Sequence, residues 1–309
     1  MPLKQELKEI IREAAIEVGF STMGVARSRN LSEHYAHFQA WLNQGYQGSM
    51  AYLERNLDKR LDPGKIMDNT KSVFVFLHPY LRPETLTPIL PGRKISRYAQ
   101  GSDYHSIIKD KLHLIAGKYL TGKYRIFTDS APVLERAWAV EAGLGWIGKN
   151  SLLLNRTLGS YFFIGIILSD MEFVPDSSLS TNHCGTCRAC MDACPTQAIV
   201  EPGVVNGSAC ISYATIENKE LEITERVVGN TEGWVFCCDI CQEVCPWNRF
   251  AKLSHDPAFD PLPIIREFML GRVNLETKED WESLEKSPIS RAGNEMMQRN
   301  IRATQAPKA

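Results

Sequence analysis

Two cysteine-rich runs hold eight of the nine cysteines in this chain. The segment HCGTCRACMDACP has the spacing C-x2-C-x2-C-x3-C-P, formed by Cys184, Cys187, Cys190 and Cys194. The second run, FCCDICQEVCPWN, also ends in Cys-Pro and contains Cys237, Cys238, Cys241 and Cys245. Thiolates are soft ligands for iron, and the first spacing is that of bacterial ferredoxins. The two runs therefore predict iron–sulfur clusters that carry single electrons.

The spacing also predicts which thiols share a cluster. In two-cluster ferredoxins the fourth cysteine of a run ligates the other cluster. The first predicted set is Cys184, Cys187, Cys190 and Cys245. The second set contains Cys194, Cys238 and Cys241 and needs a fourth ligand. We choose Cys210 for this place and leave Cys237 spare. The reason is that adjacent side chains, such as those of Cys237 and Cys238, rarely point to one corner of a cube. A zinc site is the alternative reading of C-x2-C pairs, but it does not need two interlocked runs.

Composition sets the broad class of the protein. The chain has 309 residues, 44% of them hydrophobic and 23% charged, with a net charge of −1. This length suggests roughly two domains, and the charge balance gives no global attraction to nucleic acid or membrane. The longest apolar run, YFFIGIIL, is too short to span a bilayer, and the amino-terminal segment lacks a signal-peptide pattern. We expect a cytoplasmic monomer in which the cysteines bind metal instead of forming disulfides.

Hydrophobic periodicity predicts an α/β arrangement in the first half of the chain. Helices are expected at residues 3–18, 32–43, 49–58, 103–120 and 132–142, the last opened by Pro132. Strands are expected at residues 20–26, 72–80, 124–129 and 160–169. Such alternation of strands and helices indicates a sheet covered by helices. After residue 250 we expect an extended piece, a short helix near 279–286 and a polar tail.

The segment GLGWIG, residues 143–148, matches the glycine pattern of a dinucleotide-binding loop. That loop requires a strand before it and a helix after it. Here a predicted helix precedes the glycines, so we do not expect a nucleotide there. A helix stop at Gly143 followed by a tight turn accounts for the pattern.

Four motifs together resemble the epoxyqueuosine reductase family: TDSAPVLERAWAVEAGLGWIGKNSLLLN, HCGTCRACMDACPTQAI, CISYATIE and CQEVCPWN. The resemblance extends to about residue 300. It implies deoxygenation of an epoxide on a modified guanosine in a tRNA anticodon loop, two 4Fe–4S clusters and a base-off cobalamin. It also implies a nitroreductase-like cobalamin-binding sheet domain, an α/β (α+β) fold, at residues 1–178. A ferredoxin-like domain is then expected at 179–250 and an extension at 251–309.

The resemblance suggests roles for particular residues. Asp129 is the expected proton donor to the epoxide oxygen, with its pKa raised by burial; a helix-capping carboxylate is the alternative. The residues expected to contact cobalamin are Arg55, Arg97, Asp129, Lys149, Asn150, Leu153, Ile164 and Ser212. For Arg55, Lys59 and Arg60 a solvated helix face explains the charges equally well. Tyr98, Asp103, Tyr104 and His105, like Arg97, could approach the corrin face or the substrate. The alternative is that Asp103 caps a helix and His105 lies on the surface, which we favour for His105 alone.

Ser212 and Tyr213 are placed by the resemblance between a cluster and the corrin, and the segment Trp247–Arg249 is expected to shield a cluster or meet RNA. The expected partners are a tRNA carrying epoxyqueuosine and a small flavodoxin-type or ferredoxin-type electron donor. Many relatives carry helical repeats after the segment SPISRAGNEMMQRN, which only nine residues follow here. Any RNA contact made by such repeats must therefore be absent or replaced, and a local basic patch is required. Two other readings remain: a corrinoid dehalogenase, and a non-catalytic electron carrier.

Overall fold

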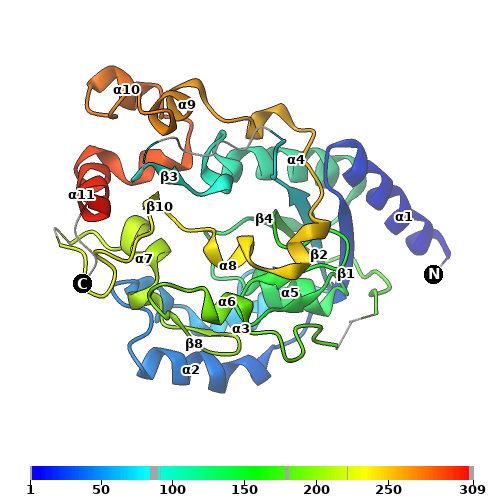
Figure 1. Ribbon diagram of the computed structural model, residues 1–309. Helices are drawn as coiled ribbons and strands as arrows, with labels where there is room; N and C mark the ends of the chain where they lie inside the picture. Colours follow the sequence, from blue (N-terminus) through cyan, green and yellow to red (C-terminus); the bar gives the residue numbers. More distant parts are fainter. Residues whose placement is uncertain (1, 84–89, 91, 178–180, 221, 306–309) are drawn as a thin grey trace.

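The computed structural model describes residues 2–83, 90, 92–177, 181–220 and 222–305, and shows a mixed α/β protein (Figure 1). Its central feature is a four-stranded sheet with the strand order β1-β2-β7-β4. The strands are β1 (Thr22–Arg27), β2 (Ser72–Pro79), β4 (Tyr124–Phe127) and β7 (Phe162–Ser169). All three pairings are antiparallel. The four strands predicted from periodicity are therefore present.

Helices cover both faces of this sheet, so its central strand is buried on both sides. All eight residues of β2 are buried, and its side chains alternate between two apolar clusters. Phe74 and Phe76 face α1 (Pro2–Glu17) and α4 (Tyr104–Tyr119). The intervening valines face α5 (Glu135–Glu141). A strand buried on both faces reads as a continuous apolar run, which explains why SVFVFLHPY shows little alternation.

Gly165 in β7 allows α4 to approach the sheet closely. A Cβ atom at this position would lie 2.9 Å from Leu112 Cδ1 and 3.1 Å from Ile108 Cγ2. Both leucine and isoleucine belong to α4. The missing side chain therefore fixes the depth at which this helix, and the residues at its amino-terminal end, sit on the sheet.

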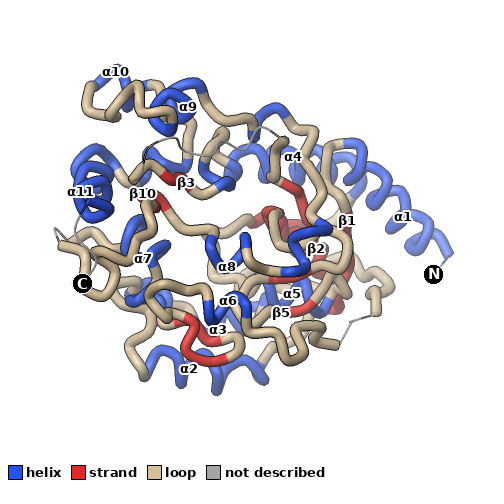
Figure 2. The backbone as a smooth tube through the Cα atoms, in the orientation of Figure 1, coloured by secondary structure: helices blue, strands red, loops and turns tan. Residues whose placement is uncertain are grey.

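Short elements build the cysteine-rich region, in which loops predominate (Figure 2). Three two-stranded sheets pair β3 (Lys94–Ile95) with β10 (Trp234–Phe236), β5 (Trp146–Ile147) with β6 (Leu153–Leu154), and β8 (Ile199–Glu201) with β9 (Val204–Val205). The helices are α6 (Ala189–Asp192), α7 (Ile211–Ile216) and α8 (Ile240–Glu243). Because β3 precedes the cysteines and β10 lies among them, this pairing joins the two parts of the chain.

The carboxyl-terminal segment is more helical than we expected. It contains α9 (Pro263–Met269), α10 (Lys278–Glu282) and α11 (Gly293–Gln305). The predicted polar tail is therefore wrong for residues 293–305. The reason is that α11 is polar on average: its helical period is present, but Arg299 and Asn300 share the buried face with two methionines and an alanine, so few apolar residues mark it.

Two other boundaries differ from the prediction. The helix expected at 49–58 is divided into a 3-10 turn (Ala51–Leu53) and α3 (Leu57–Leu61), because Asn56 adopts a left-handed backbone with φ +57°. The helix expected from Pro132 starts at Glu135. The predicted helix near residue 35 is α2 (Tyr35–Asn43). Across the described ranges, no helix has the length and apolarity needed to cross a membrane.

Candidate active site

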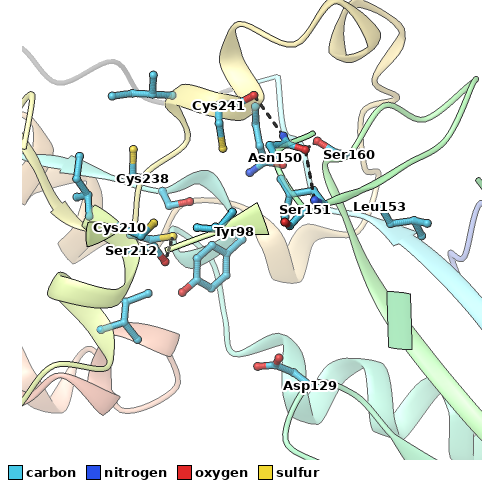
Figure 3. Close-up of a pocket in the computed structure, with 18 of the residues that line it drawn as sticks. Tyr98, Asp129, Asn150, Ser151, Leu153, Ser160, Cys210, Ser212, Cys238 and Cys241 are labelled. Carbon is cyan, nitrogen blue, oxygen red and sulfur yellow. Dashed lines mark hydrogen bonds between the residues drawn. The ribbon is translucent and has the colours of Figure 1, made fainter. Parts of the chain in front are cut away.

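A cavity of about 550 Å³ lies between the edge of the main sheet and the cysteine-rich region. One wall comes from the sheet and includes Thr128, Asp129 and Ile164. The opposite wall carries cysteine side chains, and Figure 3 shows Cys238 and Cys241 across the cavity from Asp129. Because the sheet is antiparallel, the end of the sheet that faces the cavity combines the carboxyl ends of β2 and β4 with the amino end of β7. The site therefore does not follow the rule for ligands at the carboxyl ends of parallel strands.

The structure brings together the cysteines of each predicted set. The second set lines the cavity, together with Cys237: Cys194, Cys210, Cys238 and Cys241. In the first set, burial raises the pKa of the Cys190 thiol, and Cys245, Cys184 and Cys187 add to this effect as close negative neighbours. No three metal-binding side chains in the described parts of the chain converge tightly enough for a single ion. A cubane is wider than an ion and takes its ligands at separated corners.

Three thiols of the second set lie in a protein environment that disfavours charge. Burial raises the pKa values of Cys210, Cys238 and Cys241, and neighbouring cysteines raise the last two further. A positively charged metal cluster compensates such thiolates, so the residues present fit this cofactor.

Asp239, between two of these cysteines, anchors the loop that carries them. Its carboxylate is fully buried and accepts hydrogen bonds from the Ser96 hydroxyl and from the Arg97 backbone nitrogen at 2.8 Å. The Arg97 guanidinium also lies 3.2 Å from it and 2.7 Å from Glu243. Arg97, expected to contact cobalamin, instead holds the cluster loop and is absent from the cavity lining.

Cys237 differs from its neighbours in its backbone. It has φ +58°, a left-handed conformation that favours glycine, and its Sγ lies 3.2 Å from Ser212 Oγ. Asp129 and Ser151, which also line the cavity, share this unusual conformation. Strained backbone of this kind concentrates at functional sites.

Asp129 lies on the loop after β4 and its side chain is 57% exposed to the cavity. Its Oδ2 accepts a hydrogen bond from the Tyr104 hydroxyl at 2.7 Å and lies 3.3 Å from His105 Nε2. Its backbone nitrogen donates to Glu135 Oε1 at 2.6 Å. The carboxylate does not cap α5, whose N-cap residue is Leu134.

The charge state of Asp129 is opposite to our expectation. Surrounding protein disfavours its charge, but the hydrogen bonds from His105 and Tyr104 outweigh this effect and lower the pKa of Asp129 to about 2. The expected rise was tied to burial against the corrin as well as apolar neighbours, and for the cofactor-bound site it stays a prediction. The proton resides on His105: burial opposes its charge, but Asp103 and Asp129 raise the pKa of His105 to about 9. Burial, aided by the charge of Asp129, raises the pKa of Glu135 to about 8.

His105 is consequently not the surface residue that we expected. It is half-buried, and its Nδ1 lies 2.7 Å from Asp103 Oδ1. Asp103 also caps α4, as predicted, by accepting a hydrogen bond from the His105 backbone nitrogen. The capping residue therefore both starts the helix and orients the imidazole toward Asp129.

The remaining predicted contacts divide into two groups. The structure places four of them in the cavity lining: Asn150, Leu153, Ile164 and Ser212. Lys149 instead donates hydrogen bonds to the carbonyl oxygens of Gly185 and Cys187, both at 2.7 Å. Arg55 is exposed and outside the lining, and Tyr213 hydrogen bonds with Ser49. In the segment Trp247–Arg249, the tryptophan packs edge-on against Trp146, beside the first cysteine set.

Comparison with known proteins decides the family. Residues 60–130 match the family model described as epoxyqueuosine reductase QueG, DUF1730, and residues 183–248 match a 4Fe–4S double cluster binding domain. The chain is 43% identical to the epoxyqueuosine reductase of Cyclobacterium marinum, over 95% of each sequence. It is 40% identical to that of Pseudomonas aeruginosa, covering 97% of this chain and 85% of the relative. This chain belongs to the epoxyqueuosine reductase family.

Solved epoxyqueuosine reductases have the same fold. A crystal structure of an epoxyqueuosine reductase with an epoxyqueuosine-modified tRNA-Tyr stem loop matches with a TM-score of 0.86 and 25% identity. The match covers 97% of this chain and 80% of that one. Neither the dehalogenase nor the electron-carrier reading is favoured by these relatives, and the 4Fe–4S model supports the predicted clusters over zinc.

Sequence reasoning missed several residues that support this epoxyqueuosine reductase site. Glu135 and Asp239 lie within segments that we had already quoted, but nothing in the spacing showed which backbone groups they would reach. Arg299 and Asn300 were available as an Arg-Asn pair near the end of the resemblance. Asn300 donates hydrogen bonds at 2.9 Å to the carbonyl oxygens of Thr215 and Val235, which belong to α7 and β10.

Proposed function

We propose that this protein reduces epoxyqueuosine to queuosine in tRNA. The reaction consumes two electrons and two protons, converts the epoxide carbons to an alkene and releases the oxygen as water. One observation carries this proposal: in a chain of the epoxyqueuosine reductase family, cluster cysteines and an acid with its own proton source face each other across one cavity.

The two clusters are proposed to form a path for electrons into the cavity. The outer cluster takes Cys184, Cys187, Cys190 and Cys245, of which Cys187 is exposed and marks the side of entry. The inner cluster takes Cys194, Cys210, Cys238 and Cys241, which line the cavity. A small flavodoxin-type or ferredoxin-type protein is the proposed donor to the exposed side.

We propose a base-off cobalamin as the second cofactor, and the chemical character of the cavity lining supports it. Aromatic and aliphatic side chains form the cavity walls: Tyr98, Tyr104, Leu153, Phe162, Phe163 and Ile164. Polar groups in the lining, including Asn150, Ser151 and Ser212, suit the amide edge of a large flat ring. When bound, the corrin supplies a low-valent cobalt that can deliver electrons to the epoxide. Leu153, Ile164 and Ser212 are its proposed contacts, while Arg55, Arg97 and Lys149 are not carried into this site.

Asp129 and His105 are proposed to supply the proton to the epoxide oxygen. In the cavity the carboxylate is charged and the imidazole carries the proton. A proton passing from His105 Nε2 to Asp129 Oδ2 crosses the observed 3.3 Å separation. Asp129 then donates it to the developing alkoxide, and Tyr104 holds the carboxylate in position.

The three regions have distinct proposed roles, although β3 and β10 join the first two. Residues 1–178 provide the sheet, the cavity wall and the acid, and residues 179–250 provide the clusters. Residues 251–309 form an extension whose described part packs against β3 and β10.

The test is anaerobic turnover. The protein is reconstituted with iron, sulfide and cobalamin, reduced chemically, and incubated with epoxyqueuosine-modified tRNA. Nucleoside mass spectrometry should show loss of one oxygen atom from the modified base, dependent on both cofactors. Unchanged tRNA with fully loaded protein would contradict the proposal.

A further inference from the structure

A second cavity of about 450 Å³ lies on the other side of the loop that carries Asp129. Phe127 at the end of β4 and the loop residues Ser130, Ala131 and Pro132 line this second cavity, whereas Thr128 and Asp129 line the first. A stretch of six residues therefore separates the two. We call the second cavity the basic groove, after the four cations that surround it: Lys59, Lys65, Lys109 and Arg125.

The four cations converge from four different elements. Lys59 belongs to α3, Lys65 to a 3-10 turn (Pro63–Lys65), Lys109 to α4 and Arg125 to β4. No carboxylate is among the described residues that line the groove. None of the four forms an ion pair within the described chain. Arg125 Nη1 donates a hydrogen bond to the Ile66 carbonyl oxygen at 2.8 Å, and Lys109 Nζ lies 3.5 Å from Ser130 Oγ.

Such a gathering of like charges stands out in a chain with a net charge of −1. Four uncompensated cations repel one another, so their convergence costs stability unless an anion binds between them. Their exposure matches this use, because Lys65 and Arg125 are exposed and the other two are half-buried. The groove thus presents three flexible lysine side chains and one planar arginine guanidinium to an oxyanion, as phosphate-binding sites do.

We propose that the basic groove binds backbone phosphates of the tRNA substrate, next to the nucleotide whose base enters the first cavity. This inference rests on the proposed function. Its geometric basis is the shared loop: residues 127–132 divide between the linings of the two cavities, so the groove lies beside the cavity that holds Asp129 and within reach of the phosphates that flank a base bound there. Phosphate contacts position a nucleic acid without reading its sequence. The groove thereby provides the local basic patch that a nearly neutral chain requires.

The experiment compares a triple variant with a matched control. Lys59→Gln, Lys65→Gln and Lys109→Gln together remove three groove charges. Lys4→Gln, Lys118→Gln and Lys278→Gln remove three charges from exposed positions that do not line the groove. Affinity is measured between about 50 and 200 mM NaCl for an epoxyqueuosine-modified anticodon stem loop and for the same RNA with guanosine at that position.

The groove variant should bind both RNAs roughly 10- to 100-fold more weakly at about 0.1 M salt, because it has lost phosphate contacts. Each lost contact should also reduce the slope of log affinity against log salt concentration by about 0.7. The control should retain wild-type affinity and slope. At saturating RNA the groove variant should still convert epoxyqueuosine, with the loss confined to KM.

If the triple variant converts epoxyqueuosine and still binds RNA with wild-type affinity and salt slope, this result would overturn the proposed phosphate binding by the groove and leave the proposed function intact. A wild-type protein that never converts epoxyqueuosine defeats the proposed function instead. If the triple variant fails to load iron, the exposed single variant Lys65→Gln serves in its place, and an unchanged salt slope there has the same adverse meaning.

Discussion

His105 Nε2 lies 3.3 Å from Asp129 Oδ2, and this contact reverses the expected charge of the acid. The carboxylate has its pKa lowered to about 2, whereas the imidazole has its pKa raised to about 9. Between these values the pair exists as an ion pair. Asp129 must therefore take a proton from His105 before it can protonate an epoxide, and the histidine becomes part of the reaction.

The first prediction concerns Asp129→Asn. The amide keeps the shape of the side chain but cannot take a proton from His105 and pass it on. Product formation should fall at least about 100-fold, while iron content and cobalamin binding remain at wild-type levels. Single-turnover assays with mass spectrometry of the nucleosides measure the first, and metal analysis measures the second.

Glu135→Gln is the matched control for this variant. Glu135 has its pKa raised to about 8 and accepts a hydrogen bond from the Asp129 backbone nitrogen. A glutamine reproduces the uncharged acid and keeps an oxygen acceptor. Its activity near neutral pH should stay within a few-fold of wild type. Wild-type turnover by Asp129→Asn would remove the carboxylate from the mechanism.

The second prediction concerns pH. The pKa of His105 is raised from 6.5 to about 9, so the imidazole keeps its proton through neutral pH. The value of kcat/KM, which reports the free enzyme, should fall as pH rises through about 9. In His105→Gln this basic limb should disappear, together with most of the activity. A limb that persists unchanged in the variant would assign the titration to another group.

Stability provides an independent check of the same pair. A folded pKa above the unfolded value means that His105 binds its proton more tightly in the folded state. The stabilisation is therefore complete below about pH 6.5 and lost as pH rises through about 9. Because Asp129 is more than half exposed, the difference between wild type and His105→Gln should be no more than about 1 kcal/mol. Denaturant midpoints at pH 6 and pH 10 measure it.

How far the sequence predicted this site depends on the range of each interaction. The cap at Asp103 and the three-cysteine part of the first set follow from spacing within short segments. Cys245 and Cys194 were added by the rule for two-cluster ferredoxins, Cys210 was chosen over Cys237, and the structure brings each set together. Asp129 came from family resemblance and His105 was one of several candidates near residue 100, but their contact was not predicted, because only the fold places the start of α4 beside the end of β4. The same applies to Arg97, whose partner Asp239 lies far along the chain.

The third prediction separates the spare thiol from the ligands. Cys237 has a left-handed backbone, so Cys237→Gly relieves strain and removes no proposed ligand. Reconstituted protein should keep wild-type iron content. Cys210→Ser removes a ligand of the inner cluster and should lose roughly half of the iron. If instead Cys237→Gly loses iron and Cys210→Ser keeps it, the two cysteines exchange roles in the proposed set.

The fourth prediction concerns the carboxyl-terminal helix that supports the inner cluster. Asn300 is almost fully buried, and its side-chain nitrogen donates to the carbonyl oxygens of Thr215 and Val235. These carbonyls belong to α7, which follows Cys210, and to β10, which precedes Cys237. In Asn300→Ala both carbonyls are left buried without their donor. The free energy of unfolding should drop by about 2–3 kcal/mol, and the cluster should be lost at lower denaturant concentration.

Asn294→Ala is the control for this effect, because Asn294 lies on the exposed face of the same helix and makes one long hydrogen bond of 3.4 Å to the Glu276 carbonyl oxygen. Its change in unfolding free energy should stay within about 0.5 kcal/mol. Visible absorbance of the clusters and far-ultraviolet circular dichroism are followed in the same anaerobic denaturant titration. If α11 only covers the surface, Asn300→Ala and Asn294→Ala will lose their clusters at the same denaturant concentration. Earlier cluster loss in Asn300→Ala alone shows that the carboxyl-terminal extension stabilises the inner cluster through α7 and β10.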